Sequence, residues 1–260
     1  MLVLAFALAA LIGASLGLMG GGGSILTVPV FVYLLGFAAK PAIAMSLPVV
    51  GATSLAGAIS HWCAGNVEAR AAFVFGLIAM TGSYLGARVS VLISGATQLT
   101  LLSVVILAAA ILMMWSSFSQ GAAGAGDDSA DKRLTLLTPK TVVVGLVIGV
   151  LTGMVGVGGG FLIVPALVIA ARVPIKQAIG TSLLVIAMNS AAGFAGYHGT
   201  VDMQWEFVGS FTAFAIAGIL VGTYLTRFLS GAALQRGFSA LLLLVGCFML
   251  YQNAHPGTLF

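Results

Sequence analysis

Charge is the property that this sequence most lacks. Its 260 residues include ten Lys and Arg and six Asp and Glu, which make up 6% of the chain, whereas soluble domains average about 25%. So few charges cannot cover the surface of a water-soluble globule, and residues 99–115 and 141–154 contain none. A soluble fold is therefore excluded, and the sequence predicts an all-α polytopic membrane protein surrounded by lipid. The basic residues are spread over short loops, so no nucleic-acid partner is expected.

Cysteine and the common cofactor motifs are also scarce. Cys63 and Cys247 are the two cysteines and lie far apart within or beside apolar segments, so we expect no disulfide framework and no thiolate metal site. The glycine runs lack the Lys-Ser/Thr of a phosphate-binding loop and the βαβ context of a dinucleotide site, so no cofactor is expected. Acidic residues paired within membrane spans would suggest an intramembrane enzyme. The four aspartates fall in polar loops instead, so no enzyme is expected: Asp127, Asp128, Asp131 and Asp202.

Glycine is abundant, with 35 residues, and it marks an internal repeat. Adding 136 to a residue number in the first half gives its counterpart in the second: residues 13–60 match residues 149–196 at 18 of 48 positions without a gap. The chain therefore divides into a first membrane repeat at 1–119, a polar linker at 120–140 and a second membrane repeat at 141–260.

Each repeat has the same sequence of apolar segments. In the first they cover residues 2–19, 25–37, 42–62, 71–93 and 99–118. The second segment, at 1.5 Å per residue, is about 20 Å long and too short to span the roughly 30 Å hydrocarbon core, so we expect a helix broken at the glycines. Pro29 and Pro165 are expected early in the half-helix that follows each break, where a missing N–H is tolerated best.

Two topologies satisfy this pattern. If each broken pair is a hairpin, it is followed by three spanning helices and the two homologous halves are inverted; if the pair crosses once, the halves are parallel. Positively charged residues favour the cytoplasmic side. The hairpin topology, which we favour, divides them eight to two and the parallel one six to four. The eight are Arg70, Lys132, Arg133, Lys140, Arg172, Lys176, Arg227 and Arg236, against Lys40 and Arg88. Both topologies place the termini outside.

The glycine segments carry a family resemblance. GLMGGGGSILTVP and GMVGVGGGFLIVP, each followed by a turn with a lysine and a serine-rich helix (AMSLPVVGATS and GTSLLVIAMNS), resemble the sulfite exporter TauE/SafE family of membrane transporters over nearly the whole chain. The resemblance implies movement of sulfite, sulfonates or other small organosulfur anions across the cytoplasmic membrane, with both motifs in the transport site. Gly21 and Ser24 are matched by Val157 and Gly160, so the copies are not expected to share substrate contacts equally.

The residues themselves suggest how an anion could be held. A helix that starts at a glycine break presents backbone N–H groups and a partial positive charge, and two such ends near the midplane would hold an anion without a buried Lys or Arg. Replacing Gly22 or Gly158 by Val is expected to block the backbone approach and disfavour positive φ. The alternative is that the glycines only allow close helix packing. The predicted substrate-binding residues are Gly20, Gly22, Gly23, Ser24, Ser46, Gly156, Gly158, Gly159, Gly160, Thr181, Ser182 and Asn189.

The sequence thus predicts a secondary transporter of a small organosulfur or sulfur oxyanion in the cytoplasmic (inner) membrane, with a passive anion channel as the alternative. It is compatible with a homodimer. His61 and His198 lie near the ends of corresponding helices and are interpreted as interfacial residues, with proton coupling as the alternative. Arg88 and Arg227 are closest to the hydrocarbon, and snorkelling is favoured over substrate contact for both.

Overall fold

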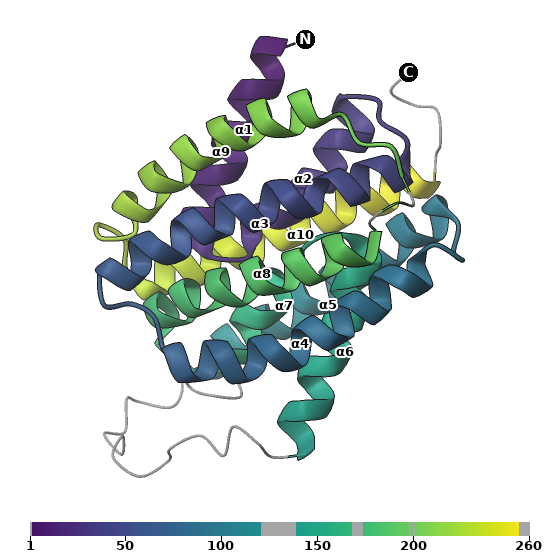
Figure 1. Ribbon diagram of the computed structural model, residues 1–260. Helices are drawn as coiled ribbons and strands as arrows, with labels where there is room; N and C mark the ends of the chain where they lie inside the picture. The colour runs from purple at the N-terminus through teal and green to yellow at the C-terminus, as the bar shows by residue number, and fades with distance from the viewer. Residues whose placement is uncertain (1, 121–138, 168–173, 198, 200, 255–260) are drawn as a thin grey trace.

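The chain is helical in all of its regular structure, within the residues that the computed structural model describes: 2–120, 139–167, 174–197, 199 and 201–254. The first repeat forms α1 (Leu2–Met19), α2 (Gly22–Pro29), the π-helical turn η1 (Val30–Leu34), α3 (Ala39–Cys63), α4 (Ala69–Ser90) and α5 (Gly95–Gln120). The second forms α6 (Pro139–Val155), α7 (Gly160–Pro165), α8 (Ile175–Tyr197), α9 (Trp205–Leu225) and α10 (Gly231–Ala254) (Figure 1). Most of the expected linker at 120–140 lies outside the described residues.

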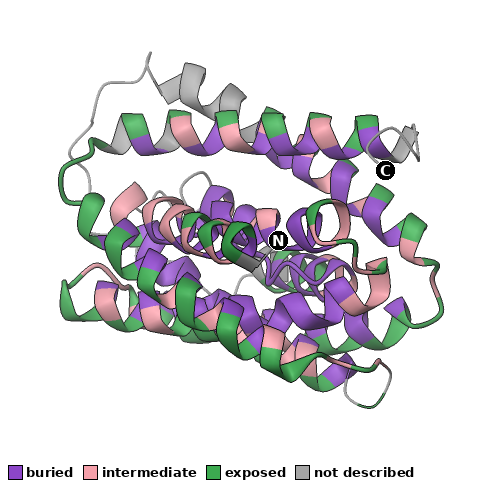
Figure 2. Ribbon diagram, turned by 90° about the horizontal axis from the view of Figure 1, so that it is seen from above, coloured by how far each residue is buried: buried purple, intermediate pink, exposed green. Residues whose placement is uncertain are grey.

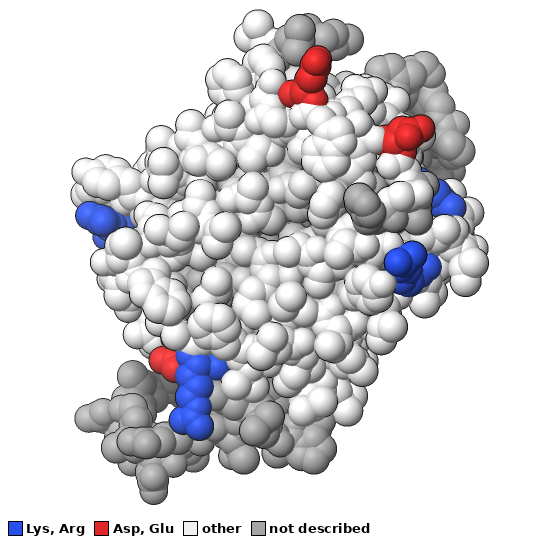
Figure 3. All heavy atoms as spheres, viewed as in Figure 1, with Lys and Arg blue, Asp and Glu red and all other residues white. Residues whose placement is uncertain are grey.

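Four helices, α3, α4, α8 and α9, are long and apolar enough to cross a membrane by length and composition. Figure 3 shows an almost uncharged face, with the Lys, Arg, Asp and Glu side chains towards its margins. Large apolar side chains such as Phe73, Leu77 and Phe214 are exposed on this fold. An exposed apolar surface of this kind fits lipid rather than water, which confirms the predicted polytopic membrane fold.

The short second segment is helical from Gly22 to Leu34, three residues earlier than expected at each end. Pro29 is the eighth and last residue of α2, so the expectation that it lies early in the half-helix was wrong. A proline at that position has no N–H for the carbonyl four residues earlier. The helix widens directly after it into the π-helical turn, where Leu35 N–H donates to Val30 O across five residues (3.0 Å).

Paired glycines join each repeat to the other. In α1 and α9, Gly13 and Gly17 pack against the backbone around Gly218 and Gly222. A Cβ added at any of these positions would overlap a backbone atom of the facing helix. The same contact recurs between α4 and α6, where the four glycines are Gly82, Gly86, Gly149 and Gly153. Small residues four apart let helices approach this closely. The first helix of each repeat thus packs on the fourth helix of the other, so the repeats interlock.

The centre of the fold is a layer in which α9, α3, α8 and α4 lie side by side, from top to bottom in Figure 1. Helices α3 and α8 are antiparallel, because Leu47 lies against Gly193 while Gly57 lies against Leu183. These two contacts are exchanged when 136 is added to the residues of α3. Buried residues gather where the helices face one another, and exposed residues on the outside (Figure 2). A pseudo-twofold axis therefore passes between α3 and α8 near their middles.

Candidate functional site

The first glycine break is a sharp reversal of the chain. Gly20 has φ +70°, and Gly21 N–H donates to Met19 O (2.9 Å) before α2 begins at Gly22. A Cβ at Gly23 would overlap the backbone of Leu16, although residues seven apart in one continuous helix are separated by about 10 Å. Helix α2 therefore folds back along α1, and the pair forms a hairpin.

The second break has the same form with a different backbone. Gly156, Gly158 and Gly159 all have positive φ, at +74°, +68° and +90°, and α7 begins at Gly160. A Cβ at Gly159 would lie 2.9 Å from the side chain of Thr152, seven residues earlier, so this chain also folds back. Gly22 is helical rather than at positive φ. The expectation that Gly22 requires positive φ was therefore wrong, because α2 starts two residues earlier in its motif than α7 does.

The two hairpin tips meet each other. A Cβ at Gly160 would lie 2.5 Å from Gly21 Cα, and a Cβ at Gly21 would overlap the Gly160 carbonyl. Near this contact, a Cβ at Gly158 would lie 2.8 Å from Ile186 and 3.2 Å from Val50, residues in the middle of α8 and α3. The starts of α2 and α7 are thus brought together halfway along two helices long enough to span the membrane.

Each tip also packs on the serine-rich helix of the other repeat. Gly20 lies against Ile179 and Ser182 of α8, and Gly156 lies against the equivalent Ile43 and Ser46 of α3. The Ser46 hydroxyl lies 2.5 Å from Gly156 O and 2.7 Å from Ile43 O, so its proton can go to either carbonyl. Ser182 Oγ donates to Ile179 O (2.8 Å). The fold therefore places Ser182 beside Gly20 and Ser46 beside Gly156, one serine at each tip.

The second tip carries further polar groups. Asn189 Nδ2 lies 3.3 Å from Thr152 Oγ1 and 3.5 Å from Gly158 O. The Asn189 Oδ1 and Ser190 Oγ atoms are buried and have no hydrogen-bond partner among the described residues. A Cβ at Gly158 would lie 2.5 Å from Ser190 Oγ. Buried polar groups are normally satisfied, so this cluster has donor and acceptor capacity beside the tip.

Sequence reasoning overlooked Ser190 and its equivalent Ser54. Both hydroxyls are fully buried and without a partner among the described residues. Their signal was available, because the 136-residue shift matches one serine with the other. Ser46 and Ser182, which the sequence analysis did select, are matched by the same 136-residue shift.

Two other predicted residues have evident local contacts. Ser24 Oγ donates to Gly21 O (2.7 Å), so its hydroxyl closes the first tip. Thr181 Oγ1 accepts a hydrogen bond from Glu68 N–H (2.9 Å), at the start of α4. The Thr181 hydroxyl is thus engaged with the end of a helix rather than with a glycine tip.

No charged side chain accompanies the tips. Among the described residues, no Lys, Arg, Asp or Glu is buried. Arg88 and Arg227 are exposed and lie over the rings of Tyr84 and Tyr224, with each guanidinium carbon less than 6 Å from the ring centroid. Backbone N–H groups, hydroxyls and an amide are therefore what this centre can offer an anion.

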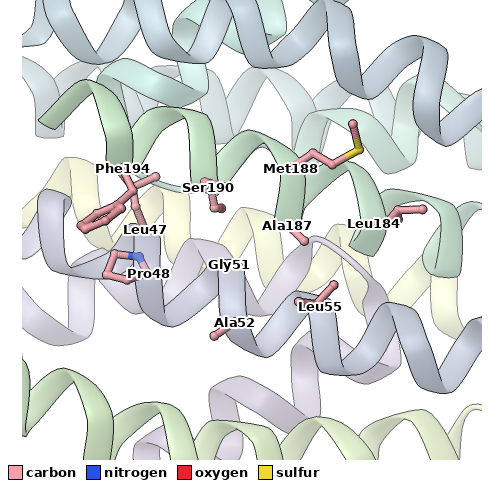
Figure 4. Close-up of a pocket in the computed structure, with 11 residues that line it drawn as sticks. Leu47, Pro48, Gly51, Ala52, Leu55, Leu184, Ala187, Met188, Ser190 and Phe194 are labelled. Carbon is pink, nitrogen blue, oxygen red and sulfur yellow. The ribbon is translucent and has the colours of Figure 1, made fainter. Parts of the chain in front are cut away.

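A groove of about 420 Å³ runs between α3 and α8 (Figure 4). Its walls are apolar, with Leu47, Leu55 and Phe194 among them, and Ser190 is its one polar lining residue. A Cβ at Gly51 would lie 3.1 Å from Ser190 Cβ. Ser190 thus lies between this groove and the second glycine tip.

Comparisons with known proteins agree with this architecture. The chain is 35% identical to a probable membrane transporter protein of Xylella fastidiosa, with 94% of this chain and 92% of the relative covered. It is 25% identical to the probable membrane transporter protein YdhB of Bacillus subtilis, over 93% of this chain and 97% of the relative. No solved structure matches the chain.

The family description "Sulfite exporter TauE/SafE" matches residues 5–249, nearly the whole sequence. The predicted family is therefore confirmed, and the apolar helices together with the named relatives identify an integral membrane protein that acts as a transporter. The chain belongs to the sulfite exporter TauE/SafE family.

Proposed function

We propose that this protein is a secondary transporter of a small organosulfur anion or sulfur oxyanion, of the sulfite or sulfonate type, in the cytoplasmic membrane. The observation that carries the proposal is that two glycine hairpin tips meet halfway along α3 and α8, in a structure whose described residues bury no charged side chain. Helix starts supply N–H donors and a partial positive charge, which suit an anion. Buried cations would be costly there in lipid.

The antiparallel contact of α3 and α8 supports inverted halves. If both helices span the membrane, the pseudo-twofold axis that exchanges them is perpendicular to them and lies in the membrane plane. The hairpin form of both glycine segments supports the same topology, since each repeat then crosses an odd number of times. In this topology, residues 1–119 and 141–260 are the two inverted halves, and both termini lie outside.

The contact between Gly21 and Gly160 favours a transporter over a passive channel. Two backbones in van der Waals contact leave no open path between the tips themselves. Passage of an anion then requires the tips to separate, and alternating access supplies such a movement. No cofactor is needed for this cycle, because an ion or substrate gradient can drive it.

Uptake into proteoliposomes tests the substrate and the mechanism together. The purified protein is compared for sulfite, isethionate, sulfate and acetate, with vesicles preloaded with the same anion for counterflow. We expect saturable counterflow with sulfite or isethionate and little with acetate. Protein with Gly209→Ala, an exposed position where a Cβ meets nothing within 4 Å, is the active control. Unsaturable flux with large unitary currents would establish the channel instead, and transport of acetate alone would refute the sulfur-anion assignment.

A further inference from the structure

His61 is a buried ionisable group that the proposed site does not use. It lies near the end of α3 with 1% of its surface exposed. Histidine is the side chain that, when unperturbed, changes charge between pH 5 and 8, and His61 is the one histidine among the described residues. Neither Nδ1 nor Nε2 makes a well-aligned hydrogen bond to a described residue, although buried imidazoles normally make one.

The internal repeat shows what this position does in the other half. Adding 136 to His61 gives Tyr197, which is also buried. The Tyr197 hydroxyl accepts a hydrogen bond from Ser90 Oγ (2.6 Å) and donates to Met154 O (3.2 Å). It thereby connects the end of α8 to the ends of α4 and α6. At that end of the molecule, hydrogen bonds between uncharged groups hold the three helix ends together.

The equivalent network is incomplete around His61. Ser90 corresponds to Thr226, which follows α9 and whose hydroxyl donates to Thr223 O in the last turn of that helix. Thr223 Oγ1 is buried and has no partner among the described residues. The Gly17 backbone on α1 faces the imidazole, and a Cβ at Gly17 would lie 2.7 Å from Thr223 N. The α1 backbone therefore adjoins the ring, and α9 packs on α1 at this point.

The charged groups on the elements around His61 lie outside the buried layer. Helix α1 carries no charged residue. Arg227 after α9 and Glu68 and Arg70 at the start of α4 are exposed, and Lys176 on the first turn of α8 is half-buried. Tyr224 on α9 is also exposed. A proton on His61 would therefore have the Gly17 backbone beside it and none of these charged side chains buried with it.

We infer that His61 is a proton-binding site that couples proton movement to anion transport, an inference that rests on the proposed transport function. A neutral imidazole has one N–H, whereas the imidazolium has two and can donate to α1 and α9 together. Protonation would then tie the end of α3 as Tyr197 ties the end of α8. If H⁺ binds more tightly to the conformation in which these hydrogen bonds form, protonation shifts the conformational equilibrium towards that conformation. If His61 binds H⁺ in one conformational state of the transport cycle and releases it in the other, proton movement is linked to the movement of the anion.

Proton binding can be measured without any substrate. The full chain, labelled with ¹⁵N-histidine and held in lipid nanodiscs, is titrated by NMR beside His61→Gln, His198→Gln and His255→Gln. We expect a ring signal that is absent only from His61→Gln and that changes protonation between pH 5 and 8. A His61 ring that stays in one protonation state throughout that range would overturn the inference while leaving the proposed transport function intact.

Coupling is measured in proteoliposomes with isethionate, a sulfonate whose charge does not change near neutral pH. We expect a pH gradient to raise wild-type accumulation at least tenfold, and His61→Gln to keep counterflow while losing this response. The His198→Gln and His255→Gln proteins should respond like wild type. Equal gradient responses in wild type and His61→Gln would overturn proton coupling at this residue. Absence of wild-type counterflow with every anion tested would refute the transport function and the coupling together.

Discussion

Gly21 and Gly160 touch backbone to backbone where the starts of α2 and α7 meet. They are also positions at which the two glycine motifs differ, since the counterpart of Gly21 is Val157 and that of Gly160 is Ser24. The departure from the repeat therefore coincides with the contact between the repeats. Residues related by a two-fold axis need not be identical, and neither Gly21 nor Gly160 has a glycine as its counterpart. The contact is instead made by one glycine from each motif.

Gly160→Ala tests this contact. The added methyl would lie 2.5 Å from Gly21 Cα, a backbone atom that cannot turn aside as a side-chain end can. We expect the tips to be held apart and counterflow of the transported anion to fall at least tenfold. The measurement is uptake into proteoliposomes at equal amounts of folded protein, judged by size-exclusion profile.

The matched control is Gly209→Ala, at an open position on α9, which should transport like wild type. Wild-type transport by well-folded Gly160→Ala would show that the tips need not touch during the cycle.

Gly158 and Gly22 should differ although the repeat matches them. Gly158 has φ +68°, where an L-residue costs about 1–2 kcal/mol, and its Cβ would also press on Ser190. Gly22 is helical, and its Cβ would meet side chains at 3.2 Å. We expect Gly158→Ala to reduce transport tenfold or more and Gly22→Ala by less than threefold. Equal losses for the two proteins would contradict a role for backbone conformation.

Local features of the fold could be predicted from the sequence. The first helix ends at Met19 as expected, because the following glycines favour a break. The break in each glycine segment followed from length, since 13 residues are too few to span the hydrocarbon, and the distribution of basic residues then favoured a hairpin over a single crossing. Ser46 and Ser182 could be selected because the same shift that pairs the glycines also pairs these serines.

Contacts between the repeats could not be predicted in this way. Nothing local to Gly20 indicates that it packs on Ser182 rather than on Ser46, because that choice depends on how the halves interlock. The different backbones at Gly22 and Gly158 have the same origin. Helix α2 begins two residues after its hairpin turn starts at Gly20, whereas α7 begins four residues after its turn starts at Gly156. Packing at the tips decides where each helix can start.

Gly153→Leu tests the interlocking of the repeats. Gly153 lies against the Ser83 carbonyl, so any side chain must separate α6 from α4. Overpacking of this kind costs about 1–3 kcal/mol, which lowers the midpoint of a protein this size by about 2–12 °C. Thermal unfolding in detergent should show this drop for Gly153→Leu but not for Gly209→Leu. Unchanged midpoints in both would mean that α4 and α6 can separate freely.

Cysteine labelling decides the topology, and two exposed loop residues give opposite results for its alternatives. In a background without Cys63 and Cys247, which are both free and exposed, single cysteines replace Ala64 after α3 or Leu92 after α4. Inverted halves place Ala64 inside and Leu92 outside, whereas parallel halves reverse both. An impermeant thiol reagent added to intact cells should therefore label Leu92→Cys and spare Ala64→Cys until the membrane is permeabilised. Gln204→Cys, external in either topology, is the control for access.

External labelling of Ala64→Cys together with protection of Leu92→Cys would replace the inverted halves with parallel ones. The antiparallel contact of α3 and α8 argues against that outcome, because parallel halves would make these two equivalent helices cross the membrane in the same direction.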